Sequence, residues 1–180
     1  MAAIMPSSMS TVFNFTFVPW FRSVAPYIHK FRQQTFVVGI TGEAIAAGKL
    51  QAIVQDLAMI QAMGVKIVLV HGFRPQVNEQ LRLKNHEPQY AAGMRITDSI
   101  ALDCAQEAAG QLRYEIEAAF SQGLPNTPMA GARVRVMSGN FLTARPVGIV
   151  DGVDFQHTGL VRKVDVEGIC RALEWDACRF

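Results

Sequence analysis

The fold class follows from residues 35–70, which read TFVVGITGEAIAAGKLQAIVQDLAMIQAMGVKIVLV. Two short apolar, β-branched runs, 35–40 and 65–70, are typical of buried strands. Between them, apolar residues recur at helical spacing from Leu50 to Ile60, and Gly64 follows where helices commonly end. A strand, a helix and a second strand in this order form a βαβ unit, so we expect two parallel strands of one sheet.

Downstream of this unit, the apolar spacing predicts three more helices. The first spans about residues 75–84 and the last about 165–173. The longest runs from Asp98 to about Ser121, with Thr97 as its N-cap, because a side-chain hydroxyl can satisfy the free amides of the first turn.

The last third of the chain also contains short β-like runs. Residues 123–131 include two prolines and predict a loop, and residues 132–163 predict strands and hairpins beside the sheet. Taken together, the elements predict an α/β fold with an open, mainly parallel sheet sandwiched by helices.

Composition excludes several classes of protein. The chain has 180 residues, with 17 basic against 15 acidic side chains, and this net charge of +2 argues against nucleic-acid binding. No apolar run approaches the roughly 18–20 residues of a membrane span, so we expect no membrane association. Three cysteines without a C-x-x-C pair, and four scattered histidines, predict neither a disulfide framework nor a metal site. Reduced thiols favour a cytoplasmic protein.

The first 42 residues contain no Asp or Glu and are rich in aromatic side chains. An acid-free start is compatible with an organellar transit peptide, but bulky rings such as Trp20 and Phe21 favour a helix that docks on another surface. We therefore divide the chain into residues 1–34, a tail with a docking helix, and residues 35–180, which carry the α/β pattern.

Two turns of the predicted sheet are candidates for ligand binding. Residues 39–50 are not a P-loop, because five residues separate Gly42 from Gly48 and no Ser or Thr follows Lys49. His71-Gly72 follows the second strand, where the choice lies between a tight turn and part of an oxyanion hole. Both turns lie at the carboxyl ends of parallel strands, the usual place for ligands in open α/β sheets.

Arg95 precedes the long helix in the segment GMRIT, residues 93–97. Its guanidinium either holds a carboxylate or phosphate through a bidentate bridge or is simply solvated.

Several blocks occur in a specific order: VPWFRSVAPYIHKFR at 18–32, HGFRPQV at 71–77, GMRITD at 93–98 and SGNF at 138–141. In this order they resemble the N-terminal part of bacterial N-acetylglutamate synthases, the amino-acid N-acetyltransferases that open arginine biosynthesis. The resemblance extends over about residues 13–173.

The resemblance implies an enzyme with two domains of different function, of which this chain contains only part of the first. In that family a kinase-like domain senses L-arginine and builds the oligomer, and a separate acetyltransferase domain binds acetyl-CoA and glutamate. By resemblance, this chain is the first part of the kinase-like domain, with no catalytic residue and no cofactor of its own, since acetyl-CoA is the co-substrate of the absent domain. Tyr27 is the candidate arginine contact, and the N-terminal helix is expected to support a homo-oligomer.

The departures from related acylglutamate kinases predict a vestigial kinase-like site. Gly39 stands where those kinases have a lysine, Thr41 where they have the first glycine, and Phe73-Arg74 where two more glycines lie. Arg95 matches the position that holds the acyl amino acid's carboxylate. The site so predicted consists of Gly39, Thr41, Gly42, His71, Gly72 and Arg95.

Three hypotheses remain open at this point. The first is the N-terminal regulatory and assembly portion of an acetyltransferase, inactive by itself; the end EWDACRF, residues 174–180, makes no buried strand and favours a truncated or frame-shifted chain. The second is a stand-alone module that pairs with a full-length synthase. The third, an active small-molecule kinase, is disfavoured by Gly39, Thr41 and Phe73.

Overall fold

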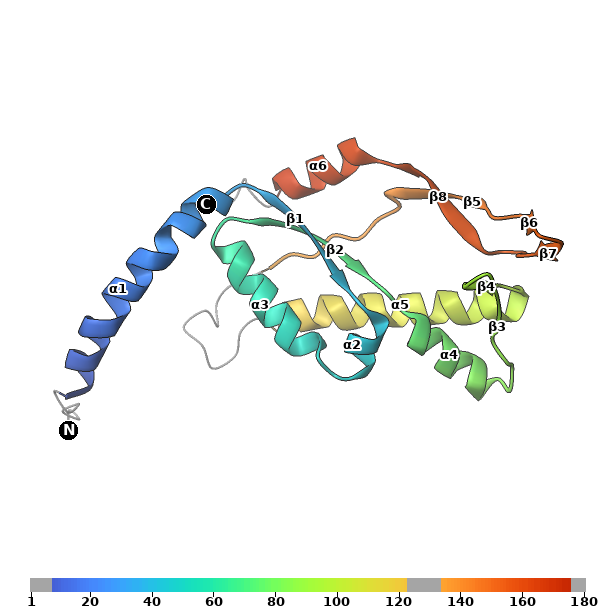
Figure 1. Cartoon of the computed structure of the whole chain (residues 1–180), viewed down its shortest axis with the longest axis horizontal. Helices are drawn as coiled ribbons and strands as arrows, with labels where there is room; N and C mark the ends of the chain where they lie inside the picture. The colour runs from blue at the N-terminus through green and yellow to red at the C-terminus, as the bar shows by residue number, and fades with distance from the viewer. Residues whose placement is uncertain (1–7, 123–133, 176–180) are drawn as a thin grey trace.

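A computed structural model describes residues 8–122 and 134–175, with side chains from residue 17 onward. Helices and short strands follow one another along the described chain, with four strands in a row before the last helix (Figure 1). They are α1 (Ser8–Phe31), β1 (Thr35–Ile40), α2 (Gly42–Ala46), α3 (Leu50–Ala62), β2 (Lys66–His71), α4 (Arg74–Leu83), β3 (Gln89–Ala91), β4 (Met94–Ile96), α5 (Ser99–Ser121), β5 (Leu142–Pro146), β6 (Ile149–Val150), β7 (Val153–Asp154), β8 (Gly159–Val164) and α6 (Val166–Trp175).

The predicted βαβ unit is confirmed. β1 and β2 pair in parallel from Thr35 opposite Lys66 to Ile40 opposite His71, and α3 crosses between them. Gly64 follows α3 with a φ of 89°, in the left-handed region that glycine adopts without strain.

The main core lies between one face of this sheet and helices α3 and α5. Val38, Ile67 and Leu69 pack from the strands against Val54, Leu57 and Leu112 of the helices. A second cluster joins α4 to the first half of α5 through Val77, Leu81 and Cys104. Full burial of one such apolar side chain contributes about 1.5–3 kcal/mol, so these two clusters hold α4 and α5 against the sheet.

The long helix α5 begins one residue later than predicted. Asp98, not Thr97, is its N-cap: a carboxylate oxygen of Asp98 accepts a hydrogen bond of 2.8 Å from the Ala101 amide. Asp98 is extended at the helix entrance, and its charge favours the positive end of the helix dipole better than a neutral hydroxyl would. The hydroxyl of Thr97 instead lies 2.8 Å from the hydroxyl of Thr158.

The β-rich region differs in detail from the prediction. β5 pairs with β8 and β6 with β7, so hairpins are present, but they form separate two-stranded sheets and the described residues 134–140 contain no strand. A further hairpin, β3–β4, lies between α4 and α5, where the sequence pattern predicted no strand. The predicted loop 123–131 lies outside the described residues.

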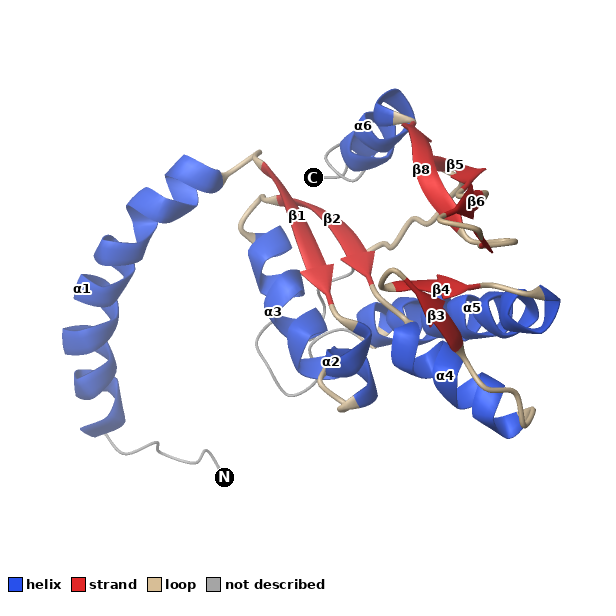
Figure 2. Cartoon of the chain, turned by 45° about the vertical axis from the view of Figure 1, so that its right-hand side comes forward, coloured by secondary structure: helices blue, strands red, loops and turns tan. Residues whose placement is uncertain are grey.

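Helix α1 extends away from the body of the molecule in both views (Figures 1 and 2). Its contact with the domain is at its C-terminal end, where the Phe31 ring meets Phe36 edge-on at 5.5 Å between centroids. Trp20, Phe21 and Tyr27 are exposed, so the described part of the chain leaves the aromatic side of α1 uncovered.

The α/β class with a parallel sheet, flanking helices and an N-terminal helix is therefore confirmed. In both figures α6 lies on the opposite side of the β1–β2 sheet from α3 and α5 (Figures 1 and 2). None of the side chains of α6 is fully buried. The two faces of the sheet are thus covered very unequally.

Candidate functional site at the strand ends

The turns after β1 and β2 meet closely enough to require two glycines. The Gly72 amide donates to the Ile40 carbonyl at 2.8 Å, which ties the end of β2 to the end of β1. A Cβ on Gly72 would lie 3.1 Å from the Gly42 nitrogen, and a Cβ on Gly42 would lie 2.7 Å from Pro75 Cδ. The predicted site residues Gly42 and Gly72 are therefore brought together, and the reason is backbone packing.

Gln76 holds the same corner from the side of α4. Its amide nitrogen donates to the Gly42 carbonyl at 3.0 Å, a contact across 34 positions of sequence. The sequence alone did not single out Gln76, because nothing in its spacing predicts which loop the first turn of α4 faces.

Thr41 is the N-cap of the short helix α2. Its hydroxyl accepts a hydrogen bond from the Ala44 amide at 3.2 Å. Thr41, at the position of the first glycine of the related kinases, therefore uses its hydroxyl to cap its own helix.

Gly39 leaves an open space where the related kinases place a cation. Gly39 is exposed, and no atom lies within 4 Å of the position that a Cβ would take. Among the described residues, no side chain therefore packs directly over Gly39. His71, at the end of β2, has its Nδ1 shielded from solvent without a hydrogen-bond partner in the described part of the chain.

Arg95 is held on β4 by a small polar cluster. One guanidinium nitrogen donates to the Asn78 side-chain oxygen at 2.6 Å, and Tyr90 donates to the same oxygen at 3.2 Å. The Tyr90 ring also lies near two guanidinium groups, at 5.1 Å from Arg95 and 5.8 Å from Arg74. Arg95 Nη1 is shielded and has no partner among the described residues. The cluster orients Arg95 against α4 and leaves one donor of its fork unused.

Thr158 fixes the backbone of Arg95 from the distant hairpin region. Its hydroxyl donates to the Arg95 carbonyl at 2.5 Å and lies 2.8 Å from the Thr97 hydroxyl. Phe155, almost fully buried, anchors the same turn. No motif pointed to Thr158, which is 63 positions from Arg95.

Close to Arg95 in sequence, Asp98 at the N-cap of α5 is the clearest electrostatic feature. The hydrogen bond from the Ala101 amide lowers the pKa of the Asp98 carboxyl, burial opposes this shift, and His86 supports it. His86 Nε2 lies 2.8 Å from the second carboxylate oxygen. Asp98 therefore links the loop after α4 to the start of α5.

Tyr27 is not brought to this corner. It is exposed on α1, which contacts the domain near residue 31 and leads away from it. A role for Tyr27 in arginine binding stays a prediction, as does the role of each residue of the strand-end site.

The described residues contain no cluster of three or more His, Cys, Asp or Glu side chains that could hold a metal ion. No helix in the described ranges is long and apolar enough to cross a membrane. Chemically, the predicted site residues offer the Arg95 guanidinium, which Asn78 orients, and lack the lysine and paired glycines that phosphoryl transfer uses.

Comparison with protein families identifies the family of this chain. Residues 34–178 match the Amino acid kinase family. The chain belongs to this family. The resemblance to N-acetylglutamate synthases is also confirmed, by the relatives and the solved structures that follow.

Two relatives carry the description amino-acid acetyltransferase. The protein from Ralstonia nicotianae is 64% identical over 157 residues, which are 87% of this chain and 35% of that protein. The protein from Pseudomonas fluorescens strain SBW25 is 47% identical over 158 residues, 88% of this chain and 36% of that protein. The chain thus spans about a third of the length of these relatives.

Two crystal structures of N-acetylglutamate synthase from Neisseria gonorrhoeae are similar to this kinase-family chain. One, in complex with coenzyme A and L-arginine, has a TM-score of 0.75 and 35% identity over 89% of this chain and 38% of that one. The other, in complex with coenzyme A and N-acetyl-glutamate, has a TM-score of 0.76 and 36% identity over 89% of this chain and 36% of that one.

Proposed function

We propose that this chain is the N-terminal, kinase-like portion of an amino-acid N-acetyltransferase, acting in regulation and assembly without catalysing a reaction itself. The complete enzyme would make N-acetylglutamate from glutamate and acetyl-CoA in the cytoplasm, as a step of arginine biosynthesis. The acetyl-CoA site would belong to the region that this chain does not span, and this portion would need no cofactor.

The main support for the proposal is the set of residues at the ends of β1 and β2. A kinase of this family would need a cationic donor near Gly39 and glycine amides after β2, but nothing packs over Gly39, the Thr41 hydroxyl caps α2 and Phe73 is the N-cap of α4. Loss of a single electrostatic donor commonly costs 10²–10³-fold in rate. A role other than phosphoryl transfer agrees with relatives described as acetyltransferases.

Regulation by L-arginine and assembly through α1 are the finer parts of the proposal. Arginine is present in a related crystal structure, which supports it as the effector, and Tyr27 is the candidate contact. The uncovered rings of Trp20 and Phe21 support assembly, because their burial requires a surface that the described chain does not supply.

The test is to exchange the aligned segment of the Ralstonia nicotianae protein for this chain. We expect the hybrid to transfer acetyl groups from acetyl-CoA to glutamate and to respond to arginine, and the 180-residue chain alone to do neither. A matched assay with ATP and N-acetylglutamate should form no acyl phosphate. Acyl phosphate above a blank, or acetyl transfer by the chain alone, would overturn the proposal.

A stand-alone regulatory module makes a different prediction. If this chain acts in trans, it should co-purify with a full-length synthase through α1 and change its response to arginine. If the full-length synthase responds to arginine as before and the hybrid is active, the hypothesis of a stand-alone module is excluded.

A further inference from the structure

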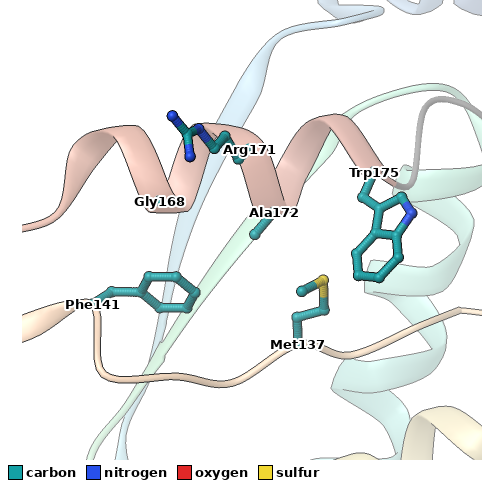
Figure 3. Close-up of a pocket in the computed structure, with 6 residues that line it drawn as sticks. All are labelled: Met137, Phe141, Gly168, Arg171, Ala172 and Trp175. Carbon is teal, nitrogen blue, oxygen red and sulfur yellow. The ribbon is translucent and has the colours of Figure 1, made fainter.

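Two features of the described chain lie outside the strand-end site, and they differ in chemistry. The first is a hollow of about 430 Å³ beneath α6. Figure 3 shows the apolar side chains of Met137, Phe141 and Trp175 directed into this hollow and the Arg171 head turned away, so its lining selects no particular ligand. The second is a cluster of charged side chains where α4 ends and α5 begins, and its chemistry is well defined.

The end of α4 holds His86 in place through its backbone. Asn85 follows the helix in the left-handed region, with a φ of 54°, which asparagine adopts more readily than most residues. The His86 amide then donates to the Leu81 carbonyl at 2.9 Å, so the chain turns back over the last turn of the helix. The position of residue 86 is thereby set by contacts that do not depend on its side chain.

The imidazole of His86 bridges the ends of two helices. Its Nε2 lies 2.8 Å from Oδ2 of Asp98, the N-cap of α5, whose other oxygen accepts a hydrogen bond from the Ala101 amide. The His86 and Asp98 side chains are 26% and 31% exposed, so water and salt screen their contact only in part. A positive charge on His86 would also lie at the carbonyl end of α4, where the helix dipole favours cations.

The other charged or titratable side chains at this joint are paired elsewhere, buried or exposed. They come from α4, α5, the β3–β4 hairpin and the loops beside them: Arg82, Lys84, Glu87, Arg95, Cys104, Glu107 and His157. Lys84 binds both carboxylate oxygens of Glu107, at 2.9 Å and 3.0 Å. Arg82 pairs with Glu79, and Arg95 donates to Asn78. Cys104 is buried, and the side chains of Glu87 and His157 are exposed.

We propose that His86 and Asp98 form a pH-dependent clasp at the base of the β3–β4 hairpin, which tightens when the imidazole takes up a proton. In the neutral imidazole, the Nε2 hydrogen can be donated to Asp98; a proton added at Nδ1 keeps this hydrogen bond and converts the contact into an ion pair. Histidine side chains titrate around pH 6.5 in model peptides, so the change falls near neutral pH. The Asp98 carboxylate is charged over that whole range, because its pKa is lowered from a value that is already acidic.

The clasp acts on the hairpin because it joins the two ends of the segment that carries it. Residues 87–97 leave α4 next to His86 and return to α5 next to Asp98, with β3 and β4 between them. Arg95 belongs to this segment, so a tighter clasp holds its guanidinium more firmly against α4. The ion pair contributes fully below the pH at which free histidine titrates, and its contribution fades as the pH rises. This inference goes beyond the proposed function and does not depend on it.

The test is amide hydrogen exchange of the 180-residue chain, followed by mass spectrometry at about pH 5.5 and about pH 8.5. His86→Gln keeps an N–H donor for Asp98 but carries no charge at either pH. The variant is compared with the natural chain at the same pH, so the intrinsic pH dependence of exchange cancels. At the lower pH we expect residues 87–97 to exchange about threefold faster in His86→Gln, the size of effect that a partly exposed ion pair produces. At the higher pH the two chains should exchange alike.

Three controls separate the clasp from other effects of the substitution. His157→Gln removes an exposed imidazole near the same helix start and should change exchange at neither pH. In an Asp98→Asn background, which keeps a helix cap, His86→Gln should have no pH-dependent effect. Helix α3 reports on the global stability of the chain. A His86→Gln effect that is equal at both pH values, that persists with Asp98→Asn or that is equally large in α3 would overturn the clasp.

Discussion

Helices α5 and α6 have the same kind of amphipathic sequence but very different surroundings. α5 lies against the sheet and α4, and seven of its residues are buried; α6 stands on the other side of the sheet with none buried. Periodic apolar residues therefore form a helix in both places, but only α5 has a packed partner among the described elements. The stability of this molecule should come from one side of its sheet.

The largest expected effect tests that asymmetry directly. Leu112→Ala on α5 should lower the free energy of unfolding by about 2–5 kcal/mol, because Leu112 is only 1% exposed and its loss leaves a cavity. Leu173→Ala on α6, where the side chain is half-buried, should cost well under about 2 kcal/mol. Chemical denaturation of both variants measures the difference. Equal losses would mean that α6 packs as firmly as α5.

The next largest effect concerns the contact between the hairpin region and the segment that leads from β4 into α5. Thr158→Val removes a hydroxyl that contacts Arg95 and Thr97, so unfolding should become easier by about 1–3 kcal/mol. Thr143→Val, on the exposed strand β5, is the matched control and should change stability by less than about 0.5 kcal/mol. If the two variants unfold alike, Thr158 does not anchor the hairpin.

A smaller effect is expected at the cap of α5, and it depends on pH. Asp98→Ala should cost about 1 kcal/mol at neutral pH. Because the pKa of Asp98 is lowered in the folded state, its charge stabilises the fold above the unfolded pKa of about 3.9, and this contribution is lost as pH falls through the lower folded pKa.

Asp98→Asn separates the charge from the cap, since asparagine also caps helices. We expect the gap in stability between the natural chain and Asp98→Asn to shrink as the pH falls below about 4. Melting temperatures recorded from pH 3 to pH 7 measure it; a constant gap would contradict the role of the Asp98 charge.

The smallest effect on folding should come from α1. Replacing Trp20 and Phe21 with alanine should change the unfolding of the domain by less than about 0.5 kcal/mol, because both rings are exposed. The same double variant should lower the molar mass of the hybrid acetyltransferase in light scattering. A Tyr114→Ala hybrid controls for the loss of an exposed ring, and an unchanged mass for the double variant would contradict assembly through α1.

Local sequence patterns predicted the elements near the strand-end corner well. The spacing of apolar residues around α3 and the position of Gly64 led to the correct parallel pair, because both are properties of consecutive residues. The cap of α5 was misplaced by one residue, since Thr97 and Asp98 are both good caps and the choice depends on Thr158, far along the chain. The β3–β4 hairpin was missed because three-residue strands carry almost no alternation.

By itself, the sequence determined the βαβ unit, the long helix α5, the aromatic character of α1 and the absence of a P-loop. Each of these depends on residues a few positions apart, where backbone preference and apolar spacing act directly. Only the tertiary structure decided how the corner is assembled: Gln76 bonds to Gly42 and Thr158 to Arg95 across 34 and 63 positions. Such contacts exist only after the helices have packed, because packing alone brings distant polar groups within hydrogen-bond distance and shields them from water.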